Sequence, residues 1–254
     1  MAIMNSIAIR LIVFACVFGG ALFGMFLRGV LPEHQLSADS KDTVRIGMSL
    51  IGTLTALVLG LLIASAKSYY DTQSSELTEM SAKVVLLDRI LAHYGPETKE
   101  DRDLLQNAIV RVLEGLWPKD SGQHPQVLPT AAGGEIIFDK IQELSPKNDT
   151  QRSLQAQALN LGMDIGKMRW MMFEQAGSFV SIPLLAVLVF WLATIFASFG
   201  LFAPRNATAL VTLFVCALSV SGAIFLILEM YSPYRGLMQI SSVPLRNALA
   251  QLGQ

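Results

Sequence analysis

The chain has 254 residues, of which 52% are hydrophobic and 15% are charged, and its formal net charge is −1. A soluble domain carries about 25% charged residues, so this composition indicates an integral membrane protein. The balanced charge argues against a nucleic-acid partner. Residues 67–177 hold twelve Lys and Arg and sixteen Asp and Glu, so this polar middle and the apolar ends are expected to face different solvents.

Four apolar segments have the length of about 20 residues that a helix needs to cross the hydrocarbon core. They cover residues 7–27, 46–66, 180–202 and 207–228. Inside the bilayer every backbone amide needs an internal partner, so we expect all four to be helices. The first is too long for the apolar part of a signal peptide, and we interpret it as a retained anchor. Its Gly20 and Gly24 form a GxxxG pair, which is typical of a helix-packing contact.

Four crossings place both chain ends and the central insert on one side of the membrane. Basic residues near the spans mark the cytoplasmic side. The side with the chain ends has six of them, and the opposite side has four: Arg10, Lys67, Lys167, Arg169, Arg235 and Arg246 against Arg28, Lys41, Arg45 and Arg205. We therefore expect the chain ends and the insert to be cytoplasmic.

The insert is predicted to be helical. Apolar residues recur at helical spacing and form a seam, composed of Leu77, Met80, Val84, Leu87 and Leu91. With no Gly or Pro between residues 67 and 94, one helix is expected to run from Val44 to His93. Further helices are predicted over 99–117, 135–144 and 150–175, with a loop over 118–134.

The predicted fold is an all-α membrane protein with four transmembrane helices and a helical cytosolic insert between spans two and three. We divide the chain into residues 1–66 (spans one and two), 67–177 (insert), 178–230 (spans three and four) and 231–254 (a cytosolic C-terminal segment).

One face of the second span carries small and hydroxyl-bearing residues with a basic residue at each end. This predicted pore face consists of Arg45, Ser49, Gly52, Thr53, Ala56, Gly60, Ala64 and Lys67. Two interpretations remain open. The small residues can form a close helix-packing ladder. Alternatively, copies of the helix around a symmetry axis line a narrow pore whose basic ends favour anions.

Motifs for catalysis are missing from the sequence. It contains no P-loop, GxGxxG, HExxH or CxxC pattern. We therefore expect no enzymatic activity, no cofactor and no metal site.

The C-terminal residues resemble the closing motif of the bacterial bestrophin-like domain proteins. In that family a fourth span ends in an acidic residue, followed by a Pro-aromatic-x-Gly turn and an Ile-Ser-x-x-Pro-Leu segment. The matching residues here are Glu229, Pro233, Tyr234, Gly236, Ser241, Pro244 and Leu245. Tyr69-Tyr70-Asp71 and Pro183 are also similar, whereas Met230-Tyr231 departs from many relatives. The resemblance implies kinship with bestrophins, which are oligomeric anion channels.

Together these observations suggest a homo-oligomeric channel in the bacterial inner membrane for small anions such as chloride. The second span would line the pore, and the expected partners are membrane lipid, further copies of the chain and inorganic ions. Two alternatives remain. The acidic insert would favour a cation channel, and a non-conducting sensor or scaffold would dock its partner on the seam from Leu77 to Leu91.

Overall fold

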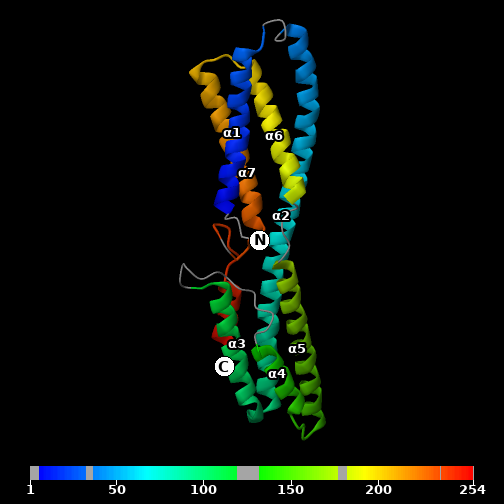
Figure 1. Cartoon of the computed structure of the whole chain (residues 1–254). Helices are drawn as coiled ribbons and strands as arrows, with labels where there is room; N and C mark the ends of the chain where they lie inside the picture. The colour runs from blue at the N-terminus through cyan, green and yellow to red at the C-terminus, as the bar shows by residue number, and fades with distance from the viewer. Residues whose placement is uncertain (1–5, 33–36, 119–131, 177–181, 235, 254) are drawn as a thin grey trace. The chain divides into compact units, whose positions relative to one another are not determined.

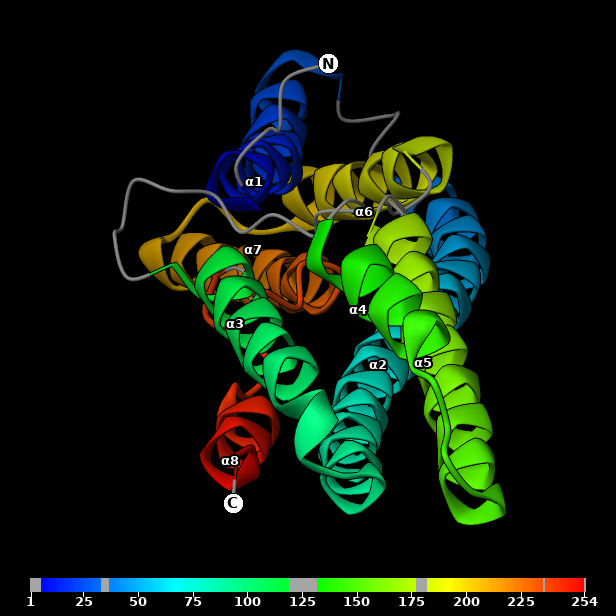
Figure 2. The same cartoon turned by 90° about the horizontal axis from the view of Figure 1, so that it is seen from below.

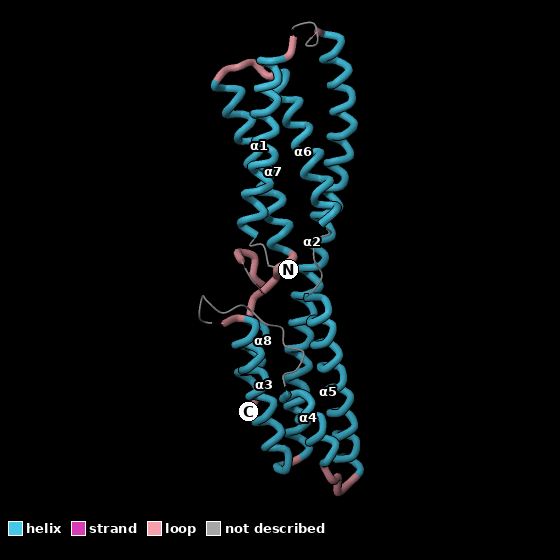
Figure 3. Tube along the Cα trace, in the orientation of Figure 1, coloured by secondary structure: helices cyan, strands magenta, loops and turns pink. Residues whose placement is uncertain are grey.

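The computed structural model describes residues 6–32, 37–118, 132–176, 182–234 and 236–253. Within these ranges the chain forms eight α-helices and no strand (Figures 1 and 3). The helices are α1 (Ser6–Val30), α2 (Ala38–Tyr94), α3 (Lys99–Leu116), α4 (Ala132–Glu143), α5 (Asp149–Ala176), α6 (Ile182–Phe202), α7 (Ala207–Met230) and α8 (Val243–Gln251). A short 3-10 turn, η2 (Pro96–Thr98), separates α2 from α3.

Four helices are long and apolar enough to cross a membrane, namely α1, α2, α6 and α7. The helices α3, α4 and α5 lie between the second and third of these in the chain. This confirms the predicted class of an all-α membrane protein with four spans and a helical insert.

Two helices begin several residues earlier than predicted. Helix α2 begins at Ala38, and not at Val44, because the Ser37 hydroxyl accepts a hydrogen bond from the Ser40 amide (3.4 Å) and caps the helix ahead of its apolar part. Helix α4 begins at Ala132, so the end of the predicted loop over 118–134 is helical. The middle of that loop lies outside the described residues.

The chain folds as two compact units. We call the first the membrane unit; it contains α1, α6, α7 and the part of α2 up to Tyr69. We call the second the insert unit; it contains α2 from Tyr70 onward, α3, α4, α5 and the C-terminal segment from Ser232. The division of the sequence at residues 66, 177 and 230 stays a prediction.

The membrane unit is built on a close crossing of α1 and α6. A Cβ atom at Gly20 or Gly24 of α1 would overlap the backbone carbonyl of Ala193 or Ala197 of α6. Gly200 of α6 lies in the same way against Ala21. Small residues let two membrane helices approach backbone to backbone, where van der Waals contact holds them together. The packing role predicted for Gly20 and Gly24 is thereby confirmed.

The insert unit has its own hydrophobic core along α2. All five seam residues are at most 5% exposed, and they pack with buried side chains of α3, α4 and α8, among them Leu105, Ile141 and Leu245. Figures 1 and 2 show α3, α4 and α5 beside the part of α2 that belongs to this unit. The periodicity of the sequence therefore marks the side of α2 that the insert covers.

We predict that Gly24→Ala destabilises the protein by about 1–3 kcal/mol, because the added methyl group forces apart two backbones that have no room to move. Thermal unfolding of the purified chain in detergent would measure this. Gly19→Ala is the matched control, since Gly19 is on the same helix and no described atom lies within 4 Å of its Cβ position. An equal loss of stability in both variants would contradict the packing argument.

Candidate functional site

Helix α2 is the span that its own chain covers least. Only 11% of its most apolar stretch is buried, against 22% in α1, 28% in α6 and 33% in α7. The buried residues of its membrane part, Thr55, Leu62 and Ala66, fall on one strip by helical spacing. A single strip of α2 therefore packs on the other spans, and the rest of its circumference is open within one copy of the chain.

The predicted pore face of α2 lies on this open part. Of its eight residues, Arg45, Ser49, Thr53, Ala56, Gly60, Ala64 and Lys67 are exposed and Gly52 is half-buried. A Cβ atom at Gly52 or Gly60 would meet no described atom within 4 Å. The small residues of this face therefore do not pack against the described parts of the chain's other spans, in contrast to Gly20 and Gly24.

The remaining side of α2 is bulky and apolar. Leu50, Leu54, Leu57 and Leu61 are between 41% and 66% exposed and follow one another at helical spacing. The membrane part of α2 thus has three strips: a packed strip, a bulky apolar strip and the predicted pore face. We call the predicted pore face the small polar strip. Successive residues are about 100° apart, which places the three strips at roughly equal angles around the helix.

The two hydroxyl groups of the pore face are turned back onto the helix. Ser49 Oγ donates to the carbonyl oxygen of Arg45 (2.8 Å), and Thr53 Oγ1 donates to that of Ser49 (2.9 Å). In these rotamers the hydroxyl protons are engaged, and the oxygen lone pairs point away from the helix. Sequence reasoning assigned these hydroxyls as donors, and their orientation is information that only the side-chain geometry supplies.

The family-motif residues lie at the end of α7 and in the insert unit. Glu229 is 3% exposed in the last turn of α7. Beyond it, the carbonyl oxygen of Pro233 accepts from the Ile240 amide (2.8 Å), and Gly236 adopts a φ of 77°, a left-handed conformation that glycine takes readily. These two features close the turn that leads to α8.

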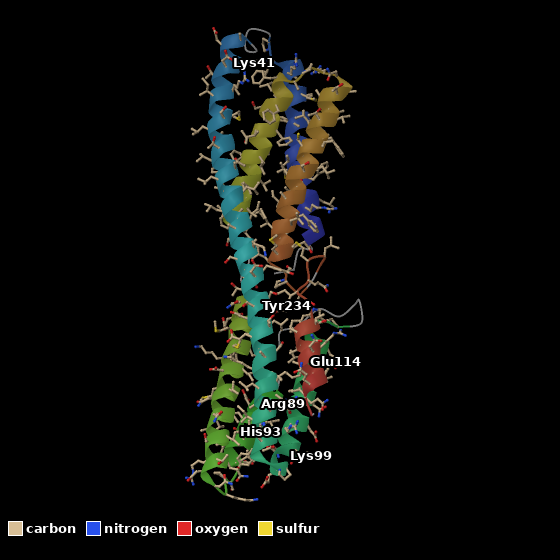
Figure 4. The ribbon with its side chains drawn as sticks, turned by 180° about the vertical axis from the view of Figure 1, so that it is seen from behind. Lys41, Arg89, His93, Lys99, Glu114 and Tyr234 are labelled. Atoms are coloured by element: carbon tan, nitrogen blue, oxygen red, sulfur yellow. The ribbon has the colours of Figure 1, made fainter. Side chains whose placement is uncertain are left out.

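The rest of the motif docks this turn into the insert unit. Tyr234, labelled in Figure 4, is 6% exposed, and its hydroxyl donates to Gln73 Oε1 (3.3 Å). Ser241 Oγ accepts from the Val243 amide (3.2 Å) at the start of α8, where Pro244 occupies the first turn. Leu245 is completely buried in the core. The motif is therefore a structural element that anchors the C-terminal segment.

Gln73 is the centre of a buried polar network that sequence reasoning missed. Its side chain is fully buried, and its amide nitrogen donates to Gln175 of α5 and to Glu76 (3.5 Å). Gln175 in turn donates to Glu76 Oε1 (3.3 Å). With Tyr234, the network joins α2, α5 and the C-terminal turn. No local pattern in the sequence predicts it, because Gln175 and Tyr234 lie 102 and 161 residues from Gln73.

Several charged groups of the insert unit pair with one another. Asp88, 1% exposed, accepts two hydrogen bonds from Arg102 (2.7 and 2.9 Å), and these bonds raise the pKa of the Arg102 guanidinium. A hydrogen bond from Lys83 lowers the pKa of Asp164 at the surface. Among the described residues, no group of three or more His, Cys, Asp or Glu is placed to hold a metal ion.

The burial of the seam corrects one functional expectation. A scaffold that docks its partner on the seam needs those side chains at the surface, but Leu77, Val84 and Leu87 are at most 2% exposed. The insert's own helices occupy this face.

Together, four apolar helices and a helical insert define an integral membrane protein. The chain belongs to the bestrophin-like family, because the model of the bestrophin-like domain matches residues 15–245. Searches among curated proteins and among solved structures return no match.

We predict that Leu245→Ala destabilises the insert unit by about 2–5 kcal/mol, because it leaves a cavity in a filled core. Hydrogen exchange of the purified protein, read at the seam residues of α2, would show it as faster exchange. Leu86→Ala, which truncates a leucine of α2 that is 51% exposed, is the control and should leave exchange unchanged. Unchanged exchange in the Leu245 variant would contradict the anchoring role of the motif.

Proposed function

We propose that this protein is a homo-oligomeric membrane channel for small inorganic ions, that chloride-like anions are the main permeant species, and that α2 lines the pore. The observation that carries the proposal is the small polar strip of α2, which lies open within one copy of the chain. Bestrophins are anion channels, and membership of the bestrophin-like family supports the same conclusion.

The three strips of α2 suit a ring of identical subunits. The packed strip holds α2 to its own bundle through Thr55, Leu62 and Ala66. The bulky strip suits contact with a neighbouring copy or with lipid. The small strip would then face the axis, where Ala56 and Gly60 keep the pore open because they have almost no side chain. If this strip faced lipid instead, its small and hydroxyl-bearing residues would form no stabilising contacts with the hydrocarbon chains.

The charges at the ends of the strip suit anions. Arg45 and Lys67 are both exposed, one near each end of the membrane part of α2. Repeated around an axis, they would form two basic rings that attract anions and repel cations. For the surroundings, we propose the bacterial inner membrane with the chain ends and the insert in the cytoplasm. One basic residue that supports this orientation, Arg235, lies outside the described residues.

We predict that Gly60→Leu blocks ion flux, because a ring of leucine side chains would fill and dry the narrowest part of the pore. Chloride and potassium flux from liposomes loaded with the purified protein would measure it. Gly19→Leu is the matched control, since Gly19 is also an exposed helical glycine with no described atom near its Cβ position. If neither ion passes through the unmodified protein, the channel proposal fails.

Cation conduction is the second candidate, and the hydroxyl geometry favours it. With their protons bonded to helix carbonyls, Ser49 and Thr53 present lone pairs, which suit a cation. To donate to an anion, each hydroxyl must give up its bond to the carbonyl, at a net cost of about 0.5–1.5 kcal/mol. The insert's excess of acidic residues would also concentrate cations.

Reversal potentials in asymmetric salt decide between the two ions. We predict chloride selectivity. The double variant Arg45→Glu and Lys67→Glu is expected to lower the chloride-to-potassium permeability ratio by roughly tenfold or more. The reason is that a cleft lined by charges of one sign raises the local concentration of counter-ions about 10- to 1,000-fold. Arg111→Glu, at an exposed position of α3, is the control. Potassium selectivity of the unmodified protein, lost in Thr53→Val, would favour the cation alternative.

A further inference from the structure

Two arginines of the membrane unit meet where α1 and α6 end. Arg28 is in the last turn of α1, and Arg205 is in the turn between α6 and α7. Arg28 Nη1 donates to the carbonyl oxygen of Ala203, and Arg205 Nη2 donates to that of Met25 (2.9 Å). Each arginine thus bonds to the segment that carries the other, and Figure 1 shows the end of α1 beside the α6–α7 turn.

The lengths of the spans place this pair at the edge of the hydrocarbon core. Arg28 is 18 residues beyond Arg10 on α1, and none of the residues between them is charged. At 1.5 Å per residue the two arginines are about 27 Å apart, close to the core thickness of about 30 Å. Arg205 directly precedes α7, whose apolar span begins at Ala207. Long basic side chains at such positions extend their charged groups into the headgroup layer.

Carboxylates of the protein do not balance these two charges. Among the described residues, no Asp or Glu pairs with either guanidinium group. The described carboxylates at this end of the unit, Asp39 and Asp42, are exposed on α2. The arginines lie instead at the C-terminal ends of α1 and α6, each of which carries a partial charge of about −0.5. These two helix ends offset about one of the two positive charges, so about one positive charge is left.

The same geometry leaves hydrogen-bond donors for a ligand. A guanidinium group has five N–H donors, and each of these two uses one on a helix carbonyl. The Arg205 guanidinium lies against the backbone of Gly29, the residue after Arg28, because a Cβ atom at Gly29 would overlap it. The planar donor pattern of arginine matches two oxygens of one phosphate group. A single phosphate can therefore bridge the two side chains.

We propose that Arg28 and Arg205 form a binding site for the headgroup phosphate of an anionic phospholipid. A phosphodiester carries one negative charge, which matches the excess at this site, and its oxygens accept from donors of both arginines. A zwitterionic lipid brings an ammonium group of its own and binds less tightly. The bound lipid ties the end of α1 to the α6–α7 turn, and the site is separate from the small polar strip of α2.

Native mass spectrometry of the purified protein in a neutral detergent tests the proposal. Phosphatidylglycerol and phosphatidylcholine are added in equal amounts, and the lipids that stay bound after release from the micelle are counted. Arg205→Gln and Arg28→Gln are made separately, because glutamine keeps a donor for the helix carbonyl and removes the charge. Lys41→Gln is the matched control, since it removes one exposed positive charge on α2 at the same end of the membrane unit (Figure 4). Circular dichroism checks that each variant is folded.

We expect the unmodified protein to retain severalfold more phosphatidylglycerol than phosphatidylcholine. Each arginine variant should lose this preference, and Lys41→Gln should keep it. Equal retention of the two lipids by the unmodified protein would overturn the proposal, as would an equal loss in all three variants or no loss in the arginine variants. Displacement of the lipid by inorganic phosphate would mean that the pair binds free phosphate, and it would overturn the lipid site. Because the readout needs no ion flux, a non-conducting protein would leave this test intact.

Discussion

The close approach of α1 and α6 is the contact on which the membrane unit depends. In hydrocarbon no hydrophobic effect drives helices together, so association rests on van der Waals contact between surfaces that fit. Gly20, Gly24 and Gly200 provide this fit by letting backbone meet backbone. With α7 also packed on α1, these helices cover one another and leave most of α2 uncovered. The proposed ring of subunits rests on this open surface of α2.

Helix α2 packs differently in the two units. In the insert unit its apolar seam is buried beneath α3, α4 and the C-terminal segment, and the Gln73 network fixes α5 and the C-terminal turn beside it. In the membrane unit only one strip is packed, and the small polar strip stays open. The part of the bestrophin-like motif beyond α7 belongs to the insert unit, because Tyr234 and Leu245 are buried in its core, whereas Glu229 lies in α7 of the membrane unit. The proposed ion pathway depends on the open strip of α2 in the membrane unit.

Hydropathy and helical periodicity were enough to predict the four spans, the seam and the order of the helices along the chain. These features are local, and each is repeated over many residues. The early start of α2 was missed because its cap, Ser37, lies in a polar stretch without periodically spaced apolar residues. The Gln73 network and the contact of Tyr231 with Ser65 (3.0 Å) join residues far apart in sequence, and the hydroxyl orientations of Ser49 and Thr53 are choices of rotamer. Hydropathy and spacing carry no signal for either.

The central claim is that the small polar strip of α2 faces an axis shared by several copies of the chain. A cryo-electron microscopy map of the purified assembly in lipid nanodiscs would test it most directly. The account predicts a ring of α2 helices around a continuous water-filled path, with Ser49, Thr53 and Gly60 at its wall. A map in which that strip faces lipid, or is sealed against a neighbouring subunit with no path through the assembly, would contradict it.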